Sequence, residues 1–112
     1  MIPKETDIVQ FETDVGVSPF ADWFDDLDTR AATKVRTALA RMEAGNLGDA
    51  KSVGDGVLER RIDWGPGYRI YFGRDGNRLI VLLAGGTKSG QRRDIRRAQS
   101  YWMDYRRRKK ER

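Results

Sequence analysis

The sequence contains no cysteine and no histidine, and each absence removes a class of chemistry. Without cysteine the chain forms no disulfides and no thiolate metal sites. Without histidine it lacks the commonest metal ligand and the side chain that most often acts as a general base. Any catalysis must therefore use lysine, arginine, tyrosine, carboxylate or hydroxyl groups, and we expect no cofactor and no metal.

Long apolar runs are also missing. The longest run, Leu79–Ala84, has the length of a strand and is too short to cross a bilayer. The segment from Met1 to Asp7 lacks the basic and apolar regions of a secretory signal. We therefore expect a cytoplasmic protein with no membrane partner. We predict a single domain over residues 1–112, with a basic tail from about residue 106 that frays.

Charge is distributed unevenly along the chain, although the net charge is only +5. Residues 1–28 hold eight acidic side chains and one basic one, whereas residues 91–112 hold ten basic and three acidic ones. Such asymmetry is typical of a molecule with one face for anions. A solvated surface that only keeps the protein soluble has the same composition, so charge alone leaves both interpretations open.

Hydrophobic periodicity predicts an α+β fold with the order β-α-α-β-β-β-α. Ser18 and Asp28 are suitable N-caps for two consecutive helices, and the short gap between these helices indicates a helical hairpin. The last three strands are joined by tight turns, which favours a small antiparallel sheet with the hairpin on one face. The expected strands cover 7–13, 57–63, 68–73 and 78–86, and the expected helices cover 19–27, 29–44 and about 89–108. Residues 46–56 are predicted to form a loop.

The period-two alternation of the central strands predicts which side chains share a face of the sheet. Leu58 and Ile62 lie on the side that we expect the helical hairpin to cover. The opposite side is then expected to face solvent as a basic concavity, joined by a lysine from the glycine-rich loop and a lysine that follows the last strand. The side chains of this predicted concavity are Lys51, Glu59, Arg61, Arg69, Tyr71 and Lys88.

Such a set of side chains suits a polyanion, because lysine and arginine neutralise phosphates and tyrosine stacks on unpaired bases. In RNA cleavage, arginine can stabilise the charge that develops on the phosphate, and a lysine can take part in proton transfer. Plainer interpretations also exist. Arg69 can simply pair with Glu59 across the strands, Tyr71 can be ordinary sheet surface, and the lysines can be solvated.

Three stretches carry a family resemblance: FADWFDDLDTRAATKVRTALARMEAGN, GNLGDAKSVGDGVLERRIDWGPGYRIYFG and LIVLLAGGTKSGQRRDIRRAQSYW. They resemble the addiction-module killer proteins, a phage-derived, HigB-like branch of the RelE/ParE toxin superfamily. The resemblance implies a RelE-like fold, a cognate antitoxin of the helix-turn-helix type, and cleavage of messenger RNA on the ribosome. The positions that match the family's motif are Lys51, Arg61, Arg69, Tyr71, Lys88 and Gln91. The next two residues, Arg92 and Arg93, are predicted to bind RNA with Gln91.

Three hypotheses about function follow from the sequence. The first is a ribosome-dependent endoribonuclease that inhibits translation, bound to its antitoxin in a hetero-oligomer. The second is a non-catalytic inhibitor of DNA gyrase or another protein, because ParE-like members of the superfamily act in this way and fold alone does not decide function. The third is a decayed module that retains only antitoxin or DNA binding.

Overall fold

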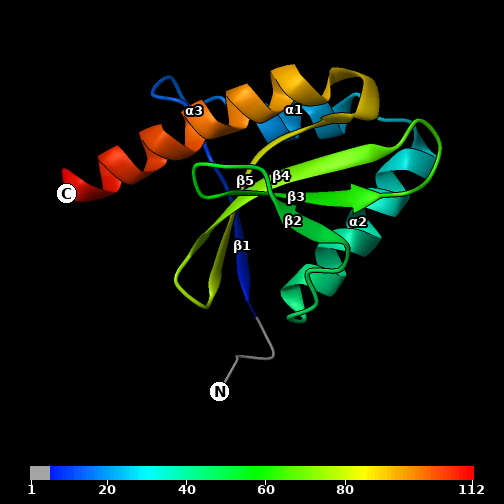
Figure 1. Cartoon of the computed structure of the whole chain (residues 1–112), viewed down its shortest axis with the longest axis horizontal. Helices are drawn as coiled ribbons and strands as arrows, with labels where there is room; N and C mark the ends of the chain where they lie inside the picture. The colour runs from blue at the N-terminus through cyan, green and yellow to red at the C-terminus, as the bar shows by residue number, and fades with distance from the viewer. Residues whose placement is uncertain (1–5) are drawn as a thin grey trace.

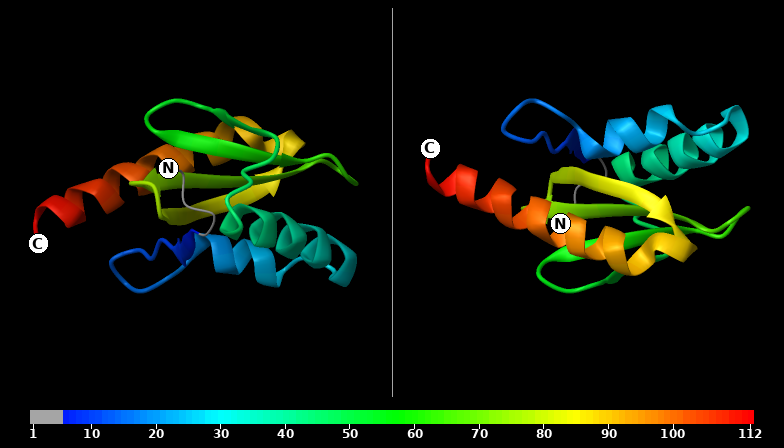
Figure 2. Two further views of the ribbon diagram at one scale, coloured as in Figure 1. Left: turned by 90° about the horizontal axis from the view of Figure 1, so that it is seen from below. Right: turned by 90° about the horizontal axis from the view of Figure 1, so that it is seen from above.

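The computed structural model describes residues 6–112, which form a five-stranded sheet with helices on both faces (Figures 1 and 2). Residues 1–5, where we expected no secretory signal, lie outside the described residues. The helices are α1 (Pro19–Asp25), α2 (Thr29–Glu43) and α3 (Gln91–Lys110), and a 3-10 turn, Lys88–Gly90, leads into α3. The strands are β1 (Asp7–Gln10), β2 (Ala50–Ser52), β3 (Val57–Ile62), β4 (Tyr68–Asp75) and β5 (Leu79–Thr87).

Both predicted N-caps of the helical hairpin are confirmed. The Ser18 hydroxyl accepts a hydrogen bond from the backbone N–H of Ala21 at 3.1 Å, and the Asp28 carboxylate accepts one from Ala31 at 2.8 Å. Each bond satisfies a backbone donor that has no partner inside its helix. Gly45 follows α2 with a φ of +92°, the left-handed conformation that commonly ends a helix.

The α+β fold is as predicted, but the sheet differs in two details. Its order is β1-β5-β4-β3-β2, and β1 runs parallel to β5, so the sheet is mixed rather than antiparallel. The chain between β1 and β5 is long, so no turn in the sequence sets their relative direction. The second difference is β2, which lies within the segment 46–56 that we predicted as a loop and pairs antiparallel with β3. Three residues between glycine-rich turns are too short to show an alternating pattern.

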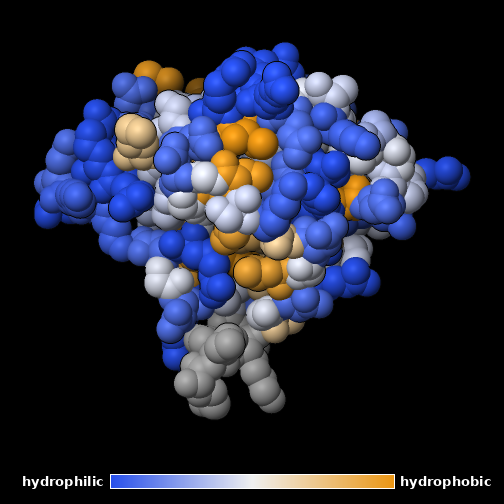
Figure 3. All heavy atoms as spheres, viewed as in Figure 1, coloured by the Kyte–Doolittle hydropathy of each residue, from blue (hydrophilic) through white to orange (hydrophobic). Residues whose placement is uncertain are grey.

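Each face of the sheet has its own apolar core. The helical hairpin of α1 and α2 covers one face, as predicted, and α3 covers the other (Figure 2). Buried residues of the first core are Phe20, Val35, Ala38, Met42, Ile62, Ile70, Phe72, Ile80 and Leu82. Buried residues of the second core are Phe11, Val57, Tyr71, Val81, Leu83, Ala84, Ala98 and Trp102. Outside these cores the face seen in Figure 3 is mostly hydrophilic, with a small apolar area near its centre.

Helix α3 is held on the sheet by an aromatic side chain that lies against a glycine. A Cβ atom built on Gly73 would lie 2.5 Å from the Trp102 ring, so only glycine leaves room for the indole on β4. Trp102 is buried and stacks on Tyr105 with ring centroids 5.1 Å apart. The helix continues to Lys110, past residue 106, where we expected it to fray, and its last turns project beyond the sheet (Figure 1).

The far half of α3 is also tied to the turn between β4 and β5. The Tyr105 hydroxyl donates a hydrogen bond to Asp75 at 2.7 Å, and the Lys109 ammonium contacts the same carboxylate at 2.5 Å. Hydrogen bonds from Lys109 and Tyr105 lower the pKa of Asp75. Burial, followed by the bond to Asp75, raises the pKa of Tyr105 to about 12. At neutral pH, therefore, the Asp75 carboxylate is ionised and the Tyr105 phenol that donates to it is neutral.

We predict that Gly73→Ala destabilises the protein by about 1–3 kcal/mol, because the added methyl group overlaps the Trp102 ring. Urea unfolding measures this loss. In a Trp102→Ala background the same substitution should cost much less, since the overlapping ring is gone. Equal costs in both backgrounds would show that Trp102 does not lie on Gly73.

We predict that Asp75→Asn removes about 0.5–1 kcal/mol of stability at pH 7, because the amide replaces a charge-assisted acceptor. The folded pKa of Asp75 is lowered, so its stabilisation is complete above the unfolded value and is lost as the pH falls through the folded value. The difference between wild type and variant should therefore shrink below about pH 4 in a pH series of urea unfolding. A constant difference down to pH 2 would contradict this assignment.

Candidate functional site

The strand register brings the predicted site residues onto one face of the sheet. Lys51 lies opposite Glu59, and Glu59 lies opposite Tyr71, so these three form one row across β2, β3 and β4. Arg61 lies opposite Arg69 in the next row. Antiparallel partners share a face, so the predicted common side of Arg61, Arg69 and Tyr71 is confirmed.

The expectation that this face is open to solvent is wrong, because α3 lies across it. Tyr71 and Glu59 are 0% exposed and Arg69 is 7% exposed. The cause is the apolar stripe of α3, in which Ala98 and Trp102 are buried against the same face. Tyr71 is thus part of the second core, and Arg69 is almost fully buried on the same face.

The carboxylate of Glu59 is the centre of a buried polar cluster beneath the start of α3. Gln91, the first residue of α3, donates a hydrogen bond to Glu59 Oε2 at 2.7 Å. Arg61 Nε donates to Glu59 Oε1 at 3.3 Å, and Arg69 Nε lies 3.9 Å from the same oxygen. These partners compensate a buried charge that would otherwise be costly. The Glu59–Arg69 pair was one of the interpretations left open by the sequence, whereas the contact between Glu59 and Gln91 was not foreseen.

Two polar atoms of this cluster have no hydrogen-bond partner among the described residues: Tyr71 Oη and Arg69 Nε. Burial, followed by the negative charge of Glu59, raises the pKa of Tyr71 far above its ordinary value. Tyr71 therefore stays protonated at physiological pH, where its hydroxyl is a hydrogen-bond donor and not a base.

The cations at the margin of the buried cluster reach solvent. The Arg61 side chain is 35% exposed, and Lys51 and Lys88 are exposed. Lys88 follows β5, and its backbone N–H donates to the carbonyl oxygen of Gly67 at 2.8 Å, which fixes it beside the turn between β3 and β4. We call the predicted site cations that reach solvent the basic rim, and its members are Lys51, Arg61, Lys88, Arg92 and Arg93.

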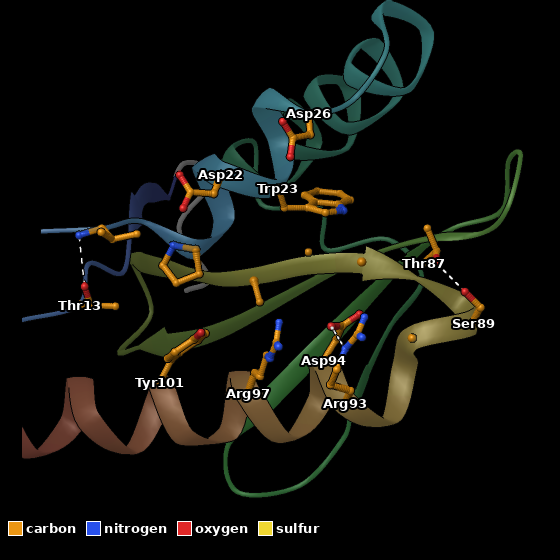
Figure 4. Close-up of a pocket in the computed structure, with 16 residues that line it drawn as sticks. Thr13, Asp22, Trp23, Asp26, Thr87, Ser89, Arg93, Asp94, Arg97 and Tyr101 are labelled. Carbon is orange, nitrogen blue, oxygen red and sulfur yellow. Dashed lines mark hydrogen bonds and ion pairs between the residues drawn. The ribbon is translucent and has the colours of Figure 1, made fainter. Parts of the chain in front are cut away.

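A cleft of about 580 Å³ between α1 and α3 is a second concave feature that the sequence did not predict (Figure 4). Its floor is the end of β5, where Gly85 and Gly86 allow close contacts on the two faces. A Cβ on Gly85 would lie 2.0 Å from the Trp23 ring, and one on Gly86 would lie 2.0 Å from the Asp94 carboxylate. The two adjacent glycines therefore allow this close approach to the backbone of β5.

Asp94 is a buried carboxylate on the α3 wall of this cleft. Its side chain is 9% exposed, and the nearest cation, Arg93 Nε, lies 3.7 Å away, too far for a hydrogen bond. Burial raises the pKa of Asp94, although the positive charges of Arg93 and Arg97 oppose the rise. The residue thus has acceptor capacity that the described chain does not fill.

Residues 6–112 include no group of three or more carboxylate, histidine or cysteine side chains placed to hold a metal ion. No helix in this part of the chain has the length and apolar character needed to cross a membrane.

We predict that Glu59→Ala costs about 3–5 kcal/mol of stability, because removing the carboxylate leaves two arginines and a glutamine without their shared acceptor. Glu59→Gln keeps the shape and one acceptor and should cost less. The matched control is Glu43→Ala, since that side chain is exposed, and its effect should stay within about 0.5 kcal/mol. Urea unfolding measures the free energy of unfolding of the three variants. An unchanged free energy of unfolding for Glu59→Ala would mean that the carboxylate does not organise the cluster.

Comparisons with known proteins show the family to which the sequence belongs. The chain is 44% identical over 81 residues to an uncharacterized protein of Haemophilus influenzae, a match that covers 71% of this chain and 82% of the relative. Residues 22–101 match the family described as "Phage derived protein Gp49-like (DUF891)". The matched segment contains the second half of α1, all of α2, four strands and all eight predicted site residues. On this agreement over most of its length, the chain belongs to the phage-derived Gp49-like family.

Proposed function

We propose that this protein is the toxin of a type II toxin-antitoxin pair and that it inhibits translation by cleaving messenger RNA on the ribosome. Membership in the Gp49-like family, which is a family of RelE/HigB-like toxins, supports the toxin part of the proposal. The observation that carries the RNA part is the position of Arg61. Its guanidinium is bonded to the buried Glu59 and yet remains partly open to solvent at the basic rim.

A guanidinium held in this way suits the stabilisation of a phosphate that gains charge. Glu59 fixes the Nε edge of Arg61, so the remaining N–H donors are free to meet a phosphate with little loss of side-chain freedom. Gln91 holds the other oxygen of Glu59 and thereby connects the start of α3 to Arg61. Preorganised donors of this kind typically contribute about 10²–10³-fold to a rate.

The remaining site residues divide by exposure. Lys51 and Lys88 reach solvent and would neutralise the phosphate or transfer protons between the 2′-hydroxyl and the leaving 5′-oxygen. Arg92 and Arg93 would bind the flanking RNA backbone, since both are exposed at the start of α3. Arg69 and Tyr71 are buried beside Glu59, so in this proposal they position Glu59 and do not touch the RNA.

The partners in this proposal are the ribosome with its messenger RNA, and a cognate antitoxin, for which a helix-turn-helix protein is the expected type. We propose that toxin and antitoxin form a hetero-oligomer and that the cell contains the toxin in its cytoplasm. Where the basic rim contacts the RNA or the antitoxin, the affinity of that complex falls as the salt concentration rises.

A second candidate function is a non-catalytic inhibitor of DNA gyrase or another protein. The burial of Arg69 and Tyr71 favours this alternative, because it removes two polar groups from contact with RNA while α3 stays on the sheet. The two candidates differ in the result expected from supercoiling assays, which only a gyrase inhibitor would affect.

The decisive experiment adds the purified protein to a translation extract and maps the ends of several transcripts. We predict new 5′ ends within translated regions and none on the same RNA without ribosomes. Arg61→Ala should reduce cleavage by about 10²–10³-fold, because the phosphate loses its preorganised donor. The matched control is Arg30→Ala, which removes an exposed arginine on α2 outside the rim and should cleave at the wild-type rate.

Intact transcripts in the presence of folded protein would refute the nuclease proposal. Loss of supercoiling by gyrase in the same preparation would then establish the second candidate. If neither activity is found and expression does not slow growth, the chain is a module that retains binding alone.

A further inference from the structure

Half of the β5 edge that faces β1 has no partner strand. The parallel pairing with β1 ends at Gln10 opposite Leu82, and one more bond runs from the Phe11 N–H to the Leu82 carbonyl oxygen at 2.9 Å. The chain then leaves the sheet in a turn closed by a bond from Thr13 to Val17. Within residues 6–112, no backbone or side-chain hydrogen bond reaches this edge of β5 between Ala84 and Thr87. An unpaired edge of this kind is a template for an added strand.

The free edge is accessible because it lies on the floor of the cleft between α1 and α3. Ala84, Gly85, Gly86 and Thr87 all line the cleft, and Figure 4 shows this end of β5 with α1 on one side and α3 on the other. The volume of about 580 Å³ is within the range that protein binding sites commonly have. The short length of β1 relative to β5 therefore leaves both the hydrogen-bonding groups and the space for another segment.

The two walls of the cleft differ in charge. Asp22 and Asp26 project from α1 on either side of Trp23, while Arg93 and Arg97 project from α3 (Figure 4). Between the arginines lies Asp94, whose side chain is more than nine-tenths buried and lies 3.7 Å from Arg93 Nε. A strand in the cleft would direct alternate side chains to the two walls, so each wall selects every second residue.

We propose that the Ala84–Thr87 edge of β5 binds an extended segment of a partner protein as an added strand that continues the line of β1. The segment carries basic side chains at the positions that face α1, where they meet Asp22 and Asp26. It carries hydrogen-bonding side chains at the positions that face α3, where one donates to Asp94. Main-chain hydrogen bonds supply affinity and the two walls supply specificity, as in other cases of strand addition.

Under the proposed function this partner is the antitoxin. That identification rests on the proposed function, whereas the strand addition itself does not. The cleft and the basic rim are formed by different residues, apart from Arg93, so a segment bound in the cleft leaves the Glu59 cluster in place.

The test uses the full chain, labelled with ¹⁵N, and an eight-residue peptide that alternates arginine and threonine. Threonine is a good strand former and its hydroxyl both donates and accepts. We expect shifts of the backbone amide signals of residues 84–87 together with those of α1 residues 22–26, and slower amide exchange along β5. A peptide of the same composition, with four arginines followed by four threonines, is the matched control and should bind at least about fivefold more weakly, since only alternation matches the walls.

Variants of α1 test the assigned wall. Asp22→Asn combined with Asp26→Asn should weaken the alternating peptide about five- to tenfold, as expected for the loss of two partly screened charges. Asp25→Asn removes a neighbouring exposed carboxylate that does not line the cleft and should change affinity less than about twofold. These substitutions lie outside the basic rim, so cleavage of transcripts by the free protein should be unchanged.

Three results would overturn the proposal. One is the absence of shifts at residues 84–87 with millimolar peptide. Another is binding as tight as that of the unmodified peptide by both of two peptides, one methylated on the odd-numbered backbone nitrogens and the other on the even-numbered ones. Such binding would not use main-chain hydrogen bonds. The third is dimerisation of the free protein with shifts at the same amides, which would assign the edge to a second copy of this chain. The transcript-cleavage assay is independent of all three, so failure of the strand addition and failure of the nuclease proposal are distinguishable.

Discussion

The contact between α3 and the sheet determines what this protein shows to solvent. Trp102 lies on the backbone of β4 at Gly73, and the helix continues from there over Tyr71 to Gln91 above Glu59. Because the helix covers the rows of polar side chains on β3 and β4, a face with the sequence pattern of an open surface becomes a second core. The Glu59 cluster is the polar end of that core, and Arg61 is the member of the cluster that remains partly open to solvent.

Burying a carboxylate with two arginines and a glutamine is weak evidence for stability, since desolvation offsets much of the attraction. The cluster has a consequence for Arg61. Its Nε donates to the buried Glu59 carboxylate, which Gln91 also holds, so the remaining guanidinium donors of Arg61 are positioned at the margin of the sheet. A surface arginine without this support would lose side-chain entropy on each encounter with a phosphate.

Local pattern was sufficient to predict much of the fold and the phase of the strands. The caps at Ser18 and Asp28 are short-range hydrogen bonds, and the shared face of Arg61 and Arg69 follows from strand periodicity. Which element covers that face depends on contacts between residues that are far apart in the sequence. The apolar stripe of α3 shows that the helix needs a surface but does not say which one, and this is why the exposure predicted for Tyr71 was wrong. The cleft arises because β1 ends before β5 does, and neither strand length alone contains that information.

The central claim is that α3 is an integral part of the fold and not a cover that opens while the sheet stays folded. Native-state hydrogen exchange tests it most directly, because it compares the opening of α3 with that of β4 in the same molecule. The account predicts that the most protected amides of α3 near Trp102 exchange with the same free energy and the same denaturant dependence as those of β4 near Tyr71. Exchange of the α3 amides through a separate opening of clearly lower free energy would contradict the account, because Arg69 and Tyr71 would then reach solvent while the sheet stays folded.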